Sequence, residues 1–326
     1  MPIYNDIFSI NQVYELMVDG EWVTTAYVVP PADQIYGWFG GGNDPAITTV
    51  TRIDYTVDTA TASTRGPVSA ARYGLGATGN ASYGWFGGGG PGARSVIDRV
   101  DYSADTATAG VRGPLSAGRA YVSATGNSYY GWFGGGGLTI ISLVDRIDYS
   151  ADTATASVRG PLSGIRRETG ATGNANFGWF AGGAQGPGGV TIVDRIEYSA
   201  DTSAATARGP LANAIRRLGG TGNTDYGWFG GGYNEPSPGQ KSTVQRITYV
   251  SDTNTAAVRG PLSSARYQLA ATGNTSYGWF GGGRITSVEV STVDRIDYAA
   301  DTATASVRGP LGVRVRIHAS TGGYPG

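Results

Sequence analysis

Short stretches in which apolar and polar side chains alternate recur along almost the whole chain. Residues 144–149, Val-Asp-Arg-Ile-Asp-Tyr, are typical, and residues 153–159, Thr-Ala-Thr-Ala-Ser-Val-Arg, follow them closely. Clusters of Gly, Asn, Asp and Pro separate such stretches. A two-residue period bounded by turn-forming residues is the pattern of short β-strands joined by tight turns. The chain is therefore predicted to be all-β.

These stretches belong to a unit that occurs six times. Each unit carries Gly-Trp-Phe, with tryptophans at positions 38, 85, 132, 179, 228 and 279, followed by a run of glycines. We predict four strands per unit: A (from an arginine to Thr-Gly-Asn), B (Tyr-Gly-Trp-Phe), C (Val-Asp-Arg-Ile-Asp-Tyr) and D (Thr-Ala-Thr-Ala-Ser-Val-Arg). The repeats begin near residues 36, 83, 130, 177, 226 and 277. Each should fold as a four-stranded antiparallel meander.

Strand B is apolar on both faces, and this indicates how the repeats are arranged. Tyr83 and Trp85 point to one side of the strand and Phe86 points to the other. A strand buried on both sides needs a sheet against each face, and neighbouring repeats in a ring supply them. Strand A is rich in Ala and Gly, which suits the crowded centre of a ring.

The strand count predicts how this ring closes. Strands B, C and D occur six times from Tyr36 onward, but the first strand A follows the first strand D, and the last strand A, within residues 314–322, ends the chain. The C-terminal strand should therefore complete the first repeat and remove its open edge. We predict one domain over residues 36–326, a six-bladed β-propeller closed by the C-terminal strand.

Residues 1–35 precede the repeats. Residues 13–17 and 22–27 predict a β-hairpin turned at Asp19-Gly20. This N-terminal extension is interpreted as a docking segment or, alternatively, as part of an incomplete seventh blade. The candidate docking side chains are Tyr4, Phe8, Tyr14 and Trp22.

The repeat resembles that of the kelch family. The shared features are the double glycine that ends strand B and the aromatic residue that ends strand C, over residues 36–322. The resemblance implies a propeller blade for each repeat. The chain departs from the family in one respect, because kelch blades carry a tryptophan in strand D and this chain carries it in strand B.

The spacing between motifs locates the length variation. The strand C arginine, the following aspartate, the strand D arginine and the next tryptophan are always separated by 6, 7 and 20 residues. The span from that tryptophan to the next strand C arginine varies as 14, 14, 14, 16, 18 and 16, so all insertions fall in the B–C loop. Exposed loops tolerate insertions and carry binding residues, although neutral drift would give the same variation. The candidate partner-binding residues are Asn43, Asp44, Arg94, Ile140, Gln185, Tyr233, Asn234, Glu235, Lys241, Arg284 and Glu289.

Composition removes several classes of function. The chain has no cysteine, which excludes disulfides, thiolate catalysis and cysteine-based zinc sites. A net charge of −1 without a basic block argues against nucleic-acid binding, and no stretch is long and apolar enough for membrane insertion. The N-terminus does not resemble a signal peptide. The single histidine, His318, has no second histidine with which to bind a metal, and we expect a satisfied interior or pore-facing side chain.

Charged residues that repeat in nearly every blade are interpreted as structural. Arg146 and Asp148 share one face of strand C and are expected in an ion-pair network with the strand D arginine. Asp152-Thr153 is expected to form an Asx-turn in the C–D hairpin, with a calcium site as the alternative. The glycine runs are expected in close packing and turns, because no phosphate-binding motif follows them. The nonrepeating acids that a glycosidase would need are Glu168, Glu235 and Glu289.

We therefore expect a structural or binding module with no enzymatic activity, cofactor or metal. The first hypothesis is a virion component assembled in the host cytoplasm, because the repeats and residues 8–14 loosely resemble tail-fibre and virion-surface proteins of marine bacteriophages. Its partners would be other virion proteins or host-surface molecules, and it could form a homo-oligomer. A bacterial lectin or adhesin at the cell surface, weakened because only Tyr233 is a clear loop aromatic, and a protein-binding kelch scaffold are the alternatives.

Overall fold

The structure is a computed structural model that describes residues 35–43, 45–234, 239–316 and 318–322. The chain divides between residues 32 and 33, and the described residues all belong to the unit Asp33–Gly326. The predicted N-terminal hairpin and the docking candidates Tyr4, Phe8, Tyr14 and Trp22 lie outside the described residues.

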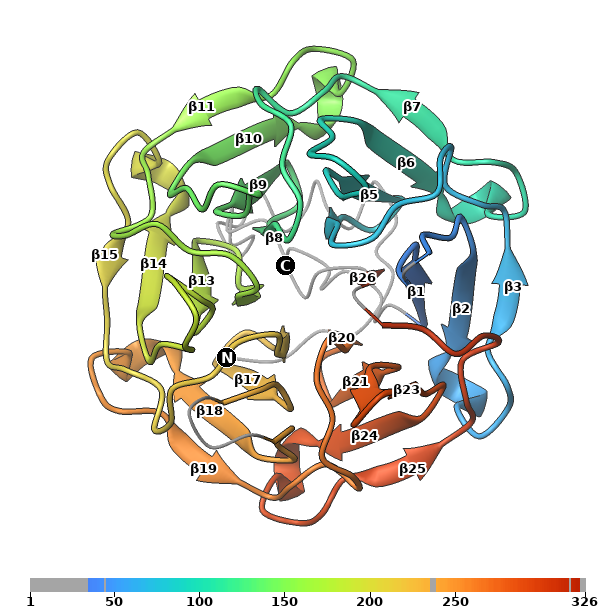
Figure 1. Cartoon of the computed structure of the whole chain (residues 1–326), viewed down its shortest axis with the longest axis vertical. Helices are drawn as coiled ribbons and strands as arrows, with labels where there is room; N and C mark the ends of the chain where they lie inside the picture. The colour runs from blue at the N-terminus through green and yellow to red at the C-terminus, as the bar shows by residue number, and fades with distance from the viewer. Residues whose placement is uncertain (1–34, 44, 235–238, 317, 323–326) are drawn as a thin grey trace, which may run out of the picture. The chain divides into compact units, whose positions relative to one another are not determined.

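Within this unit, six four-stranded antiparallel sheets stand around a common axis, as Figure 1 shows. In every sheet the strands lie in the order A-B-C-D, and the A strands of neighbouring sheets contact one another at the centre. A 3-10 helix follows each strand C. The predicted six-bladed propeller is confirmed, and the described residues contain no seventh sheet of this kind.

The blades are numbered from the one that contains Tyr36. Blade 1 holds β26 (Ala319–Gly322), β1 (Tyr36–Gly40), β2 (Val50–Asp54), η1 (Tyr55–Val57) and β3 (Ser63–Arg65). Blade 2 holds β4 (Gly76–Gly79), β5 (Tyr83–Gly87), β6 (Ile97–Asp101), η2 (Tyr102–Ala104) and β7 (Gly110–Arg112). Blade 3 holds β8 (Ser123–Gly126), β9 (Tyr130–Gly134), β10 (Val144–Asp148), η3 (Tyr149–Ala151) and β11 (Ser157–Arg159).

The other three blades follow the same plan. Blade 4 holds β12 (Gly170–Gly173), β13 (Phe177–Ala181), β14 (Val193–Glu197), η4 (Tyr198–Ala200) and β15 (Thr206–Ala207). Blade 5 holds β16 (Gly219–Gly222), β17 (Tyr226–Gly230), β18 (Val244–Thr248), η5 (Tyr249–Ser251) and β19 (Ala257–Arg259). Blade 6 holds β20 (Ala270–Gly273), β21 (Tyr277–Gly281), β24 (Val293–Asp297), η6 (Tyr298–Ala300) and β25 (Ser306–Arg308), and its B–C loop adds the hairpin β22 (Arg284–Ile285) and β23 (Val288–Glu289).

The last strand closes the ring as predicted. β26 pairs antiparallel with β1, with Ala319 opposite Gly40 and Gly322 opposite Gly37. The paired part is shorter than the predicted strand within residues 314–322, because the residues before Ala319 belong to the connection that leads in from β25. Strands from the two ends of the described chain therefore share one sheet.

The core lies between blades and is built from strand B. Its tryptophan and phenylalanine are buried on opposite faces, as in Trp85 and Phe86, which are both 0% exposed. Glycines allow the blades to approach. A Cβ on Gly87 would come within 2.6 Å of Phe133 in the next blade, and Gly88, with φ +73°, has the left-handed backbone that the B–C turn requires. This confirms the packing role expected for the glycine runs.

Each junction between blades repeats one set of polar and aromatic contacts. At the junction of blades 2 and 3, Trp85 Nε1 donates to an Asp152 carboxylate oxygen at 2.9 Å. Arg99 and Arg112 lie 3.0 and 3.4 Å from the same oxygen. Tyr149 stacks on Trp85 with ring centroids 3.9 Å apart. Two cations and an indole N–H from one blade thus converge on one carboxylate of the next.

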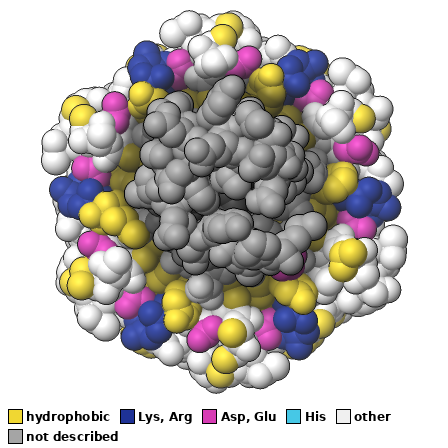
Figure 2. Space-filling model, turned by 180° about the vertical axis from the view of Figure 1, so that it is seen from behind, with side chains coloured by type: hydrophobic (Ala, Val, Ile, Leu, Met, Phe, Trp, Pro, Cys, Tyr) yellow, Lys and Arg dark blue, Asp and Glu magenta, His cyan; other side chains and the backbone are white. Residues whose placement is uncertain are grey.

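The closing junction is built in the same way, which makes the ring continuous. There Trp279 Nε1 donates to Asp58 at 2.8 Å, and Tyr55 stacks on Trp279 at 3.8 Å. The predicted network of strand C and strand D arginines is therefore confirmed, and it crosses every junction. The arginines are partly exposed, and Figure 2 shows basic and acidic side chains alternating around the periphery of one face.

The roles predicted for the two repeating aspartates were wrong. Asp152, expected in an Asx-turn, is the acceptor at the junction. Asp148, expected in the ion-pair network, makes the Asx-type turn, because its Oδ1 accepts from the Ser150 N–H at 2.9 Å and from the Ser150 hydroxyl at 2.7 Å. Within the described residues, no group of three or more acidic or histidine side chains is arranged to hold a metal ion.

Candidate functional site

The centre of the ring opens into a cavity on the face that carries the B–C loops. The cavity has a volume of about 130 Å³ and is lined by the beginnings of the A strands. A second cavity of about 80 Å³ opens at the other ends of these strands. Both cavities are lined by one small residue per blade: Ala77, Ala124, Ala171, Gly220, Ala271 and Ser320.

A rim of left-handed residues surrounds the first cavity. In five blades, one residue has positive φ at the end of the connection from strand D to strand A: Gly74 at +66°, Tyr121 at +58°, Glu168 at +61°, Arg217 at +62° and Gln268 at +60°. The corresponding residue of blade 1 is position 317, which is outside the described residues. Non-glycine residues adopt this conformation only at a cost, and strained residues of this kind cluster at ligand-binding and active sites. We call these residues and the one before each of them the rim.

Main-chain hydrogen bonds run from blade to blade along the five described positions of the rim. The N–H of Tyr121 donates to the carbonyl of Gly74 at 2.7 Å, and that of Glu168 donates to the carbonyl of Tyr121 at 3.2 Å. The N–H groups of Arg217 and Gln268 continue the series at 2.8 Å each. The backbone of the rim is therefore held in place independently of its side chains.

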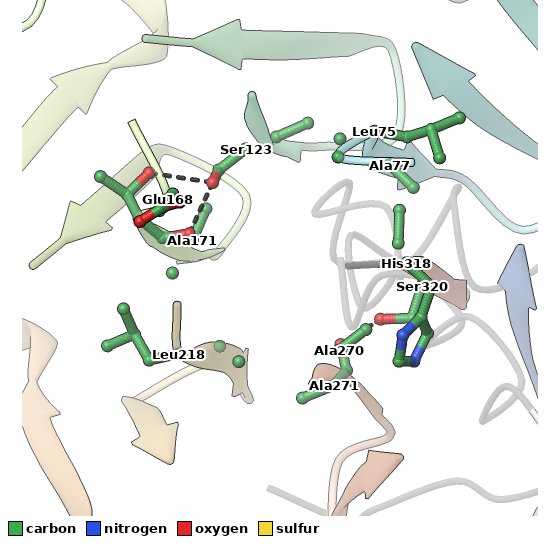
Figure 3. A pocket seen from close by; sticks show the side chains of 18 of the residues that line it. Leu75, Ala77, Ser123, Glu168, Ala171, Leu218, Ala270, Ala271, His318 and Ser320 are labelled. Carbon is green, nitrogen blue, oxygen red and sulfur yellow. Dashed lines mark hydrogen bonds between the residues drawn. The ribbon is translucent and has the colours of Figure 1, made fainter. Parts of the chain in front are cut away.

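The rim side chains differ from blade to blade and are strongly polar. Glu168 lies 3.3 Å from Arg216 Nη1 and 3.0 Å from Arg217 Nε. Between the neighbouring blades 6 and 1, Arg316 donates to the Gln268 amide oxygen at 3.3 Å. Figure 3 shows Glu168, Ser123 and His318 among the residues around the cavity.

Tyrosines lie among these charges. Tyr121 is flanked by Arg167, whose guanidinium is 5.7 Å from the ring, and by Tyr73, whose ring centroid is 6.1 Å away. Burial, with smaller contributions from Tyr73 and Glu168, raises the pKa of the Tyr121 hydroxyl above its usual value, against the opposing effect of Arg217 and Arg167. The hydroxyl is thus protonated at neutral pH and can donate a hydrogen bond to a ligand.

His318 lies in the wall of the cavity and differs from the satisfied histidine that was expected. It is 7% exposed, and neither ring nitrogen has a hydrogen-bond partner of standard geometry among the described residues, although the Gly281 backbone slightly favours its charged form. Burial lowers the pKa of His318 to about 3. A Cβ on Gly282 would approach His318 within 2.7 Å, and the Phe39 ring lies 5.7 Å away, so the imidazole fills an interior slot in its neutral form.

Of the predicted B–C loop residues, the structure brings Tyr233, Arg284 and Glu289 to the rim. Tyr233 packs edge-on against Tyr267, with centroids 5.4 Å apart, and Glu289 lies 2.8 Å from Arg316 Nε. The backbone of Arg284 pairs with that of Tyr267.

The other candidates do not gather into a site. Asn43 is bound to the backbone of the last D–A connection, because its Oδ1 accepts from the Arg316 N–H at 3.0 Å and its Nδ2 donates to the Arg314 carbonyl at 3.1 Å. Arg94 and Gln185 are exposed, and Ile140, Asn234 and Lys241 are partly exposed. Asp44 and Glu235 lie outside the described residues.

The rim residues in the D–A connections were missed as a site by the sequence analysis, although Glu168 was noted as a nonrepeating acid. Loop length was taken as the signal, and these connections have constant length. The signal that could have found them is the change in amino-acid type at equivalent positions of these equally long connections. After the conserved connection the blades carry Tyr-Gly, Ala-Tyr, Arg-Glu, Arg-Arg, Tyr-Gln and Arg-Ile, starting at positions 73, 120, 167, 216, 267 and 316.

A buried ion pair anchors the D–A connection just before the rim in four blades. Arg119 is 1% exposed and lies 2.8 Å from Asp145, whose carboxylate also accepts from the Ser116 N–H at 3.0 Å. The same pair occurs as Arg72–Asp98, Arg166–Asp194 and Arg266–Asp294. In the other two blades both partners are uncharged: Ile215 with Gln245, and Val315 with Thr51. The two positions thus change together, as a buried charge pair requires.

Comparison with known proteins identifies the fold and no family. No protein-family model matches the chain, and no curated protein is similar enough in sequence to be called a relative. Among solved structures, the one described as "Structure of YjhT" matches with a TM-score of 0.65 and 11% sequence identity, over 78% of this chain and 88% of that one. The chain thus has the fold of a six-bladed β-propeller. No helix among the described residues has the length and apolar character needed to span a membrane.

Proposed function

We propose that this protein is a non-enzymatic binding module and that its ligand site is the rim with the cavity beneath it. One observation carries the proposal. At the rim, five described blades share one backbone conformation and differ in side chain, from Gly74 to Tyr121, Glu168, Arg217 and Gln268. A ligand that is not six-fold symmetric needs different groups around it, and the side chains of the rim supply them on one shared backbone.

The arrangement of the acids supports binding over catalysis. A glycosidase needs two carboxylates that are free to transfer a proton or attack the sugar. Glu168 lies against Arg216 and Arg217, and Glu289 lies against Arg316. The repeating aspartates hold the blade junctions.

The proposal can be tested with the full chain on a glycan and metabolite array. Any compound retained should be recovered chemically unchanged, and its retention should fall at least tenfold in Tyr121→Ala. Arg94→Ala alters an exposed B–C loop residue whose side chain does not line the cavity, and it serves as the matched control. Ligands that Tyr121→Ala retains fully would place the site elsewhere, and a chemically altered product would show an enzyme.

The expectation that this module belongs to a virion stays a prediction. A phage particle would use such a rim to contact a host surface or a neighbouring subunit. Peptide mass fingerprinting of purified particles tests it, and consistent absence of the chain from particles would remove the virion role while leaving the binding site untouched.

A further inference from the structure

We infer that the ligand at the rim is an acidic saccharide held by its carboxylate group. This inference rests on the proposed function and specifies the chemistry of its ligand. Three features carry it: the sign of the charge at the rim, the arginine N–H groups that have no partner there, and the tyrosines and hydroxyls between them.

Within the part of the chain that the structure describes, the rim and the hairpin beside it (β22 and β23) carry more positive than negative charge. Arg167, Arg216, Arg217, Arg284 and Arg316 outnumber Glu168 and Glu289. The whole chain has a net charge of −1, so this excess is local. A cluster of one sign in a concave site raises the local concentration of ligands of the opposite sign.

Two of these arginines keep donors available. Arg217 uses its Nε toward Glu168 at 3.0 Å and makes no other ion pair or hydrogen bond within the described residues. Arg167 is partly exposed and has no carboxylate partner among the described residues, so its terminal N–H groups are available. A guanidinium offers donors in a planar fork that matches a carboxylate. Both arginines act electrostatically on Tyr121, which places them on the same arc of the rim.

The surroundings of this arc suit a sugar ring. Tyr121 and Tyr73 offer partly exposed aromatic faces. Below them the Ser123 hydroxyl donates to the Thr169 carbonyl at 2.6 Å and accepts from the Thr169 hydroxyl at 2.9 Å, so the remaining lone pairs of the two hydroxyls can accept from a sugar hydroxyl. An extended peptide is disfavoured, because the rim N–H groups are already used in blade-to-blade hydrogen bonds.

Other blades supply substitutions for the test that this backbone accepts. Gln268 has φ +60° at the position equivalent to Glu168 and Arg217, so Glu168→Gln and Arg217→Gln place a residue that the rim already tolerates. Ala120 occupies the position equivalent to Arg167, which justifies Arg167→Ala. Circular dichroism and thermal melting should therefore show folded variants.

The experiment measures binding of glucuronate, of its neutral isostere glucuronamide, of glucose 6-phosphate and of acetate to the full chain by saturation-transfer NMR. Glucuronate should bind at least tenfold more tightly than glucuronamide or acetate, since both the carboxylate charge and the sugar ring contribute to binding. Arg217→Gln and Arg167→Ala should each weaken it by about tenfold, the effect of losing one charge-assisted hydrogen bond. Glu168→Gln should strengthen it, because two arginines lose a competing carboxylate. Arg94→Ala should change nothing.

Three outcomes would overturn the inference: equal binding of glucuronate and glucuronamide, weaker binding in Glu168→Gln, or no binding of any acid. A preference for glucose 6-phosphate over glucuronate would also overturn it, because it would assign the arginines to phosphate. In each case the proposed function survives if array ligands are still lost in Tyr121→Ala. The proposed function itself fails if Tyr121→Ala retains the array ligands fully or if the ligands are recovered chemically altered.

Discussion

At the residue scale, the six blades act as internal controls for one another. The position that His318 occupies in blade 1 holds Leu75, Val122, Thr169, Leu218 and Leu269 in the other blades. Each of these side chains lines the same cavity wall. Blade 1 therefore places an ionisable side chain where three of its neighbours place leucine, and the slot around it is built for an apolar group.

This substitution predicts a pH-dependent stability. The pKa of His318 is about 3 in the folded state and 6.5 in an unfolded chain, so the unfolded state binds the proton more tightly. The stability contributed by neutral His318 is complete above pH 6.5 and is lost as the pH falls toward 3. Between pH 6.5 and 5 the free energy of unfolding should fall by about 1.5 kcal/mol on this account.

His318→Leu should remove this dependence. Urea unfolding at pH 7.5, 6.5 and 5 measures it, with Leu269→His in the equivalent position of blade 6 as the converse variant, which should gain a similar dependence. A His318→Leu curve that still falls by the wild-type amount over this range would assign the effect to other groups.

The buried ion pair before the rim gives a second prediction at this scale. Arg119→Ile should cost about 3–5 kcal/mol, because it leaves Asp145 buried without a counter-charge. Arg119→Ile with Asp145→Gln should cost at least about 2 kcal/mol less than the single change, because the pair would then match Ile215 and Gln245 of blade 5. In that blade Gln245 still accepts from the Asn213 N–H at 3.0 Å. Additive costs in a double-mutant cycle of urea unfolding would contradict this explanation.

At the element scale, the strands were predictable and their long-range contacts were not. Strand B, with Trp85 and Phe86 on opposite faces, is predicted to be buried on both faces. The number of times its motif recurs predicts the number of blades. The partners of Asp148 and Asp152 could not be inferred, because two residues of one type lie four positions apart and one partner is in the neighbouring blade. Spacing along one repeat contains no information on contacts between repeats.

The contrast between these two aspartates can be measured. Asp152→Ala should destabilise by about 3 kcal/mol, since it leaves Trp85 Nε1, Arg99 and Arg112 without their common acceptor. Asp148→Ala should cost about 1 kcal/mol, the usual value for losing a capping side chain at an exposed turn. Urea unfolding of the two variants compares them directly, and a larger loss for Asp148→Ala would reverse the assignment.

The candidate site was only partly predictable, for a related reason. Tyr233, Arg284 and Glu289 stand in loops that vary in length, and length variation is visible in one sequence. Arg167 and Arg217 stand in connections of constant length, so only their difference from the equivalent residues distinguishes them. The connections meet at a rim only because the blades stand in a ring. A single blade therefore does not reveal this arrangement.

At the scale of the whole molecule, stability depends on the last strand. β26 supplies the inner strand of blade 1, and the Thr321 hydroxyl lies 3.0 Å from the Tyr102 hydroxyl in blade 2. A ring with this strand removed has an unpaired edge at β1 and an exposed apolar blade face. Unpaired edges of this kind promote association with other chains.

Truncation after Leu311 should therefore lower the melting temperature by more than 10 °C or convert the protein to aggregates. Thr321→Val keeps the strand and removes one hydrogen bond, and it should shift the melting temperature by only about 2–4 °C. Differential scanning fluorimetry and size-exclusion chromatography provide the measurements. A truncated chain that stays monomeric and melts with the full chain would show that closure contributes little.

The main-chain hydrogen bonds along the rim fix its backbone and leave its side chains free to differ. Main-chain N–H and carbonyl groups link the five described rim positions, and Gly, Tyr, Glu, Arg and Gln occupy them with the same backbone conformation, so each position accepts different side chains. Under the proposed function, the ligand selectivity of the rim can therefore change one position at a time, by natural variation or in the laboratory, while the contacts that fold the ring stay as they are.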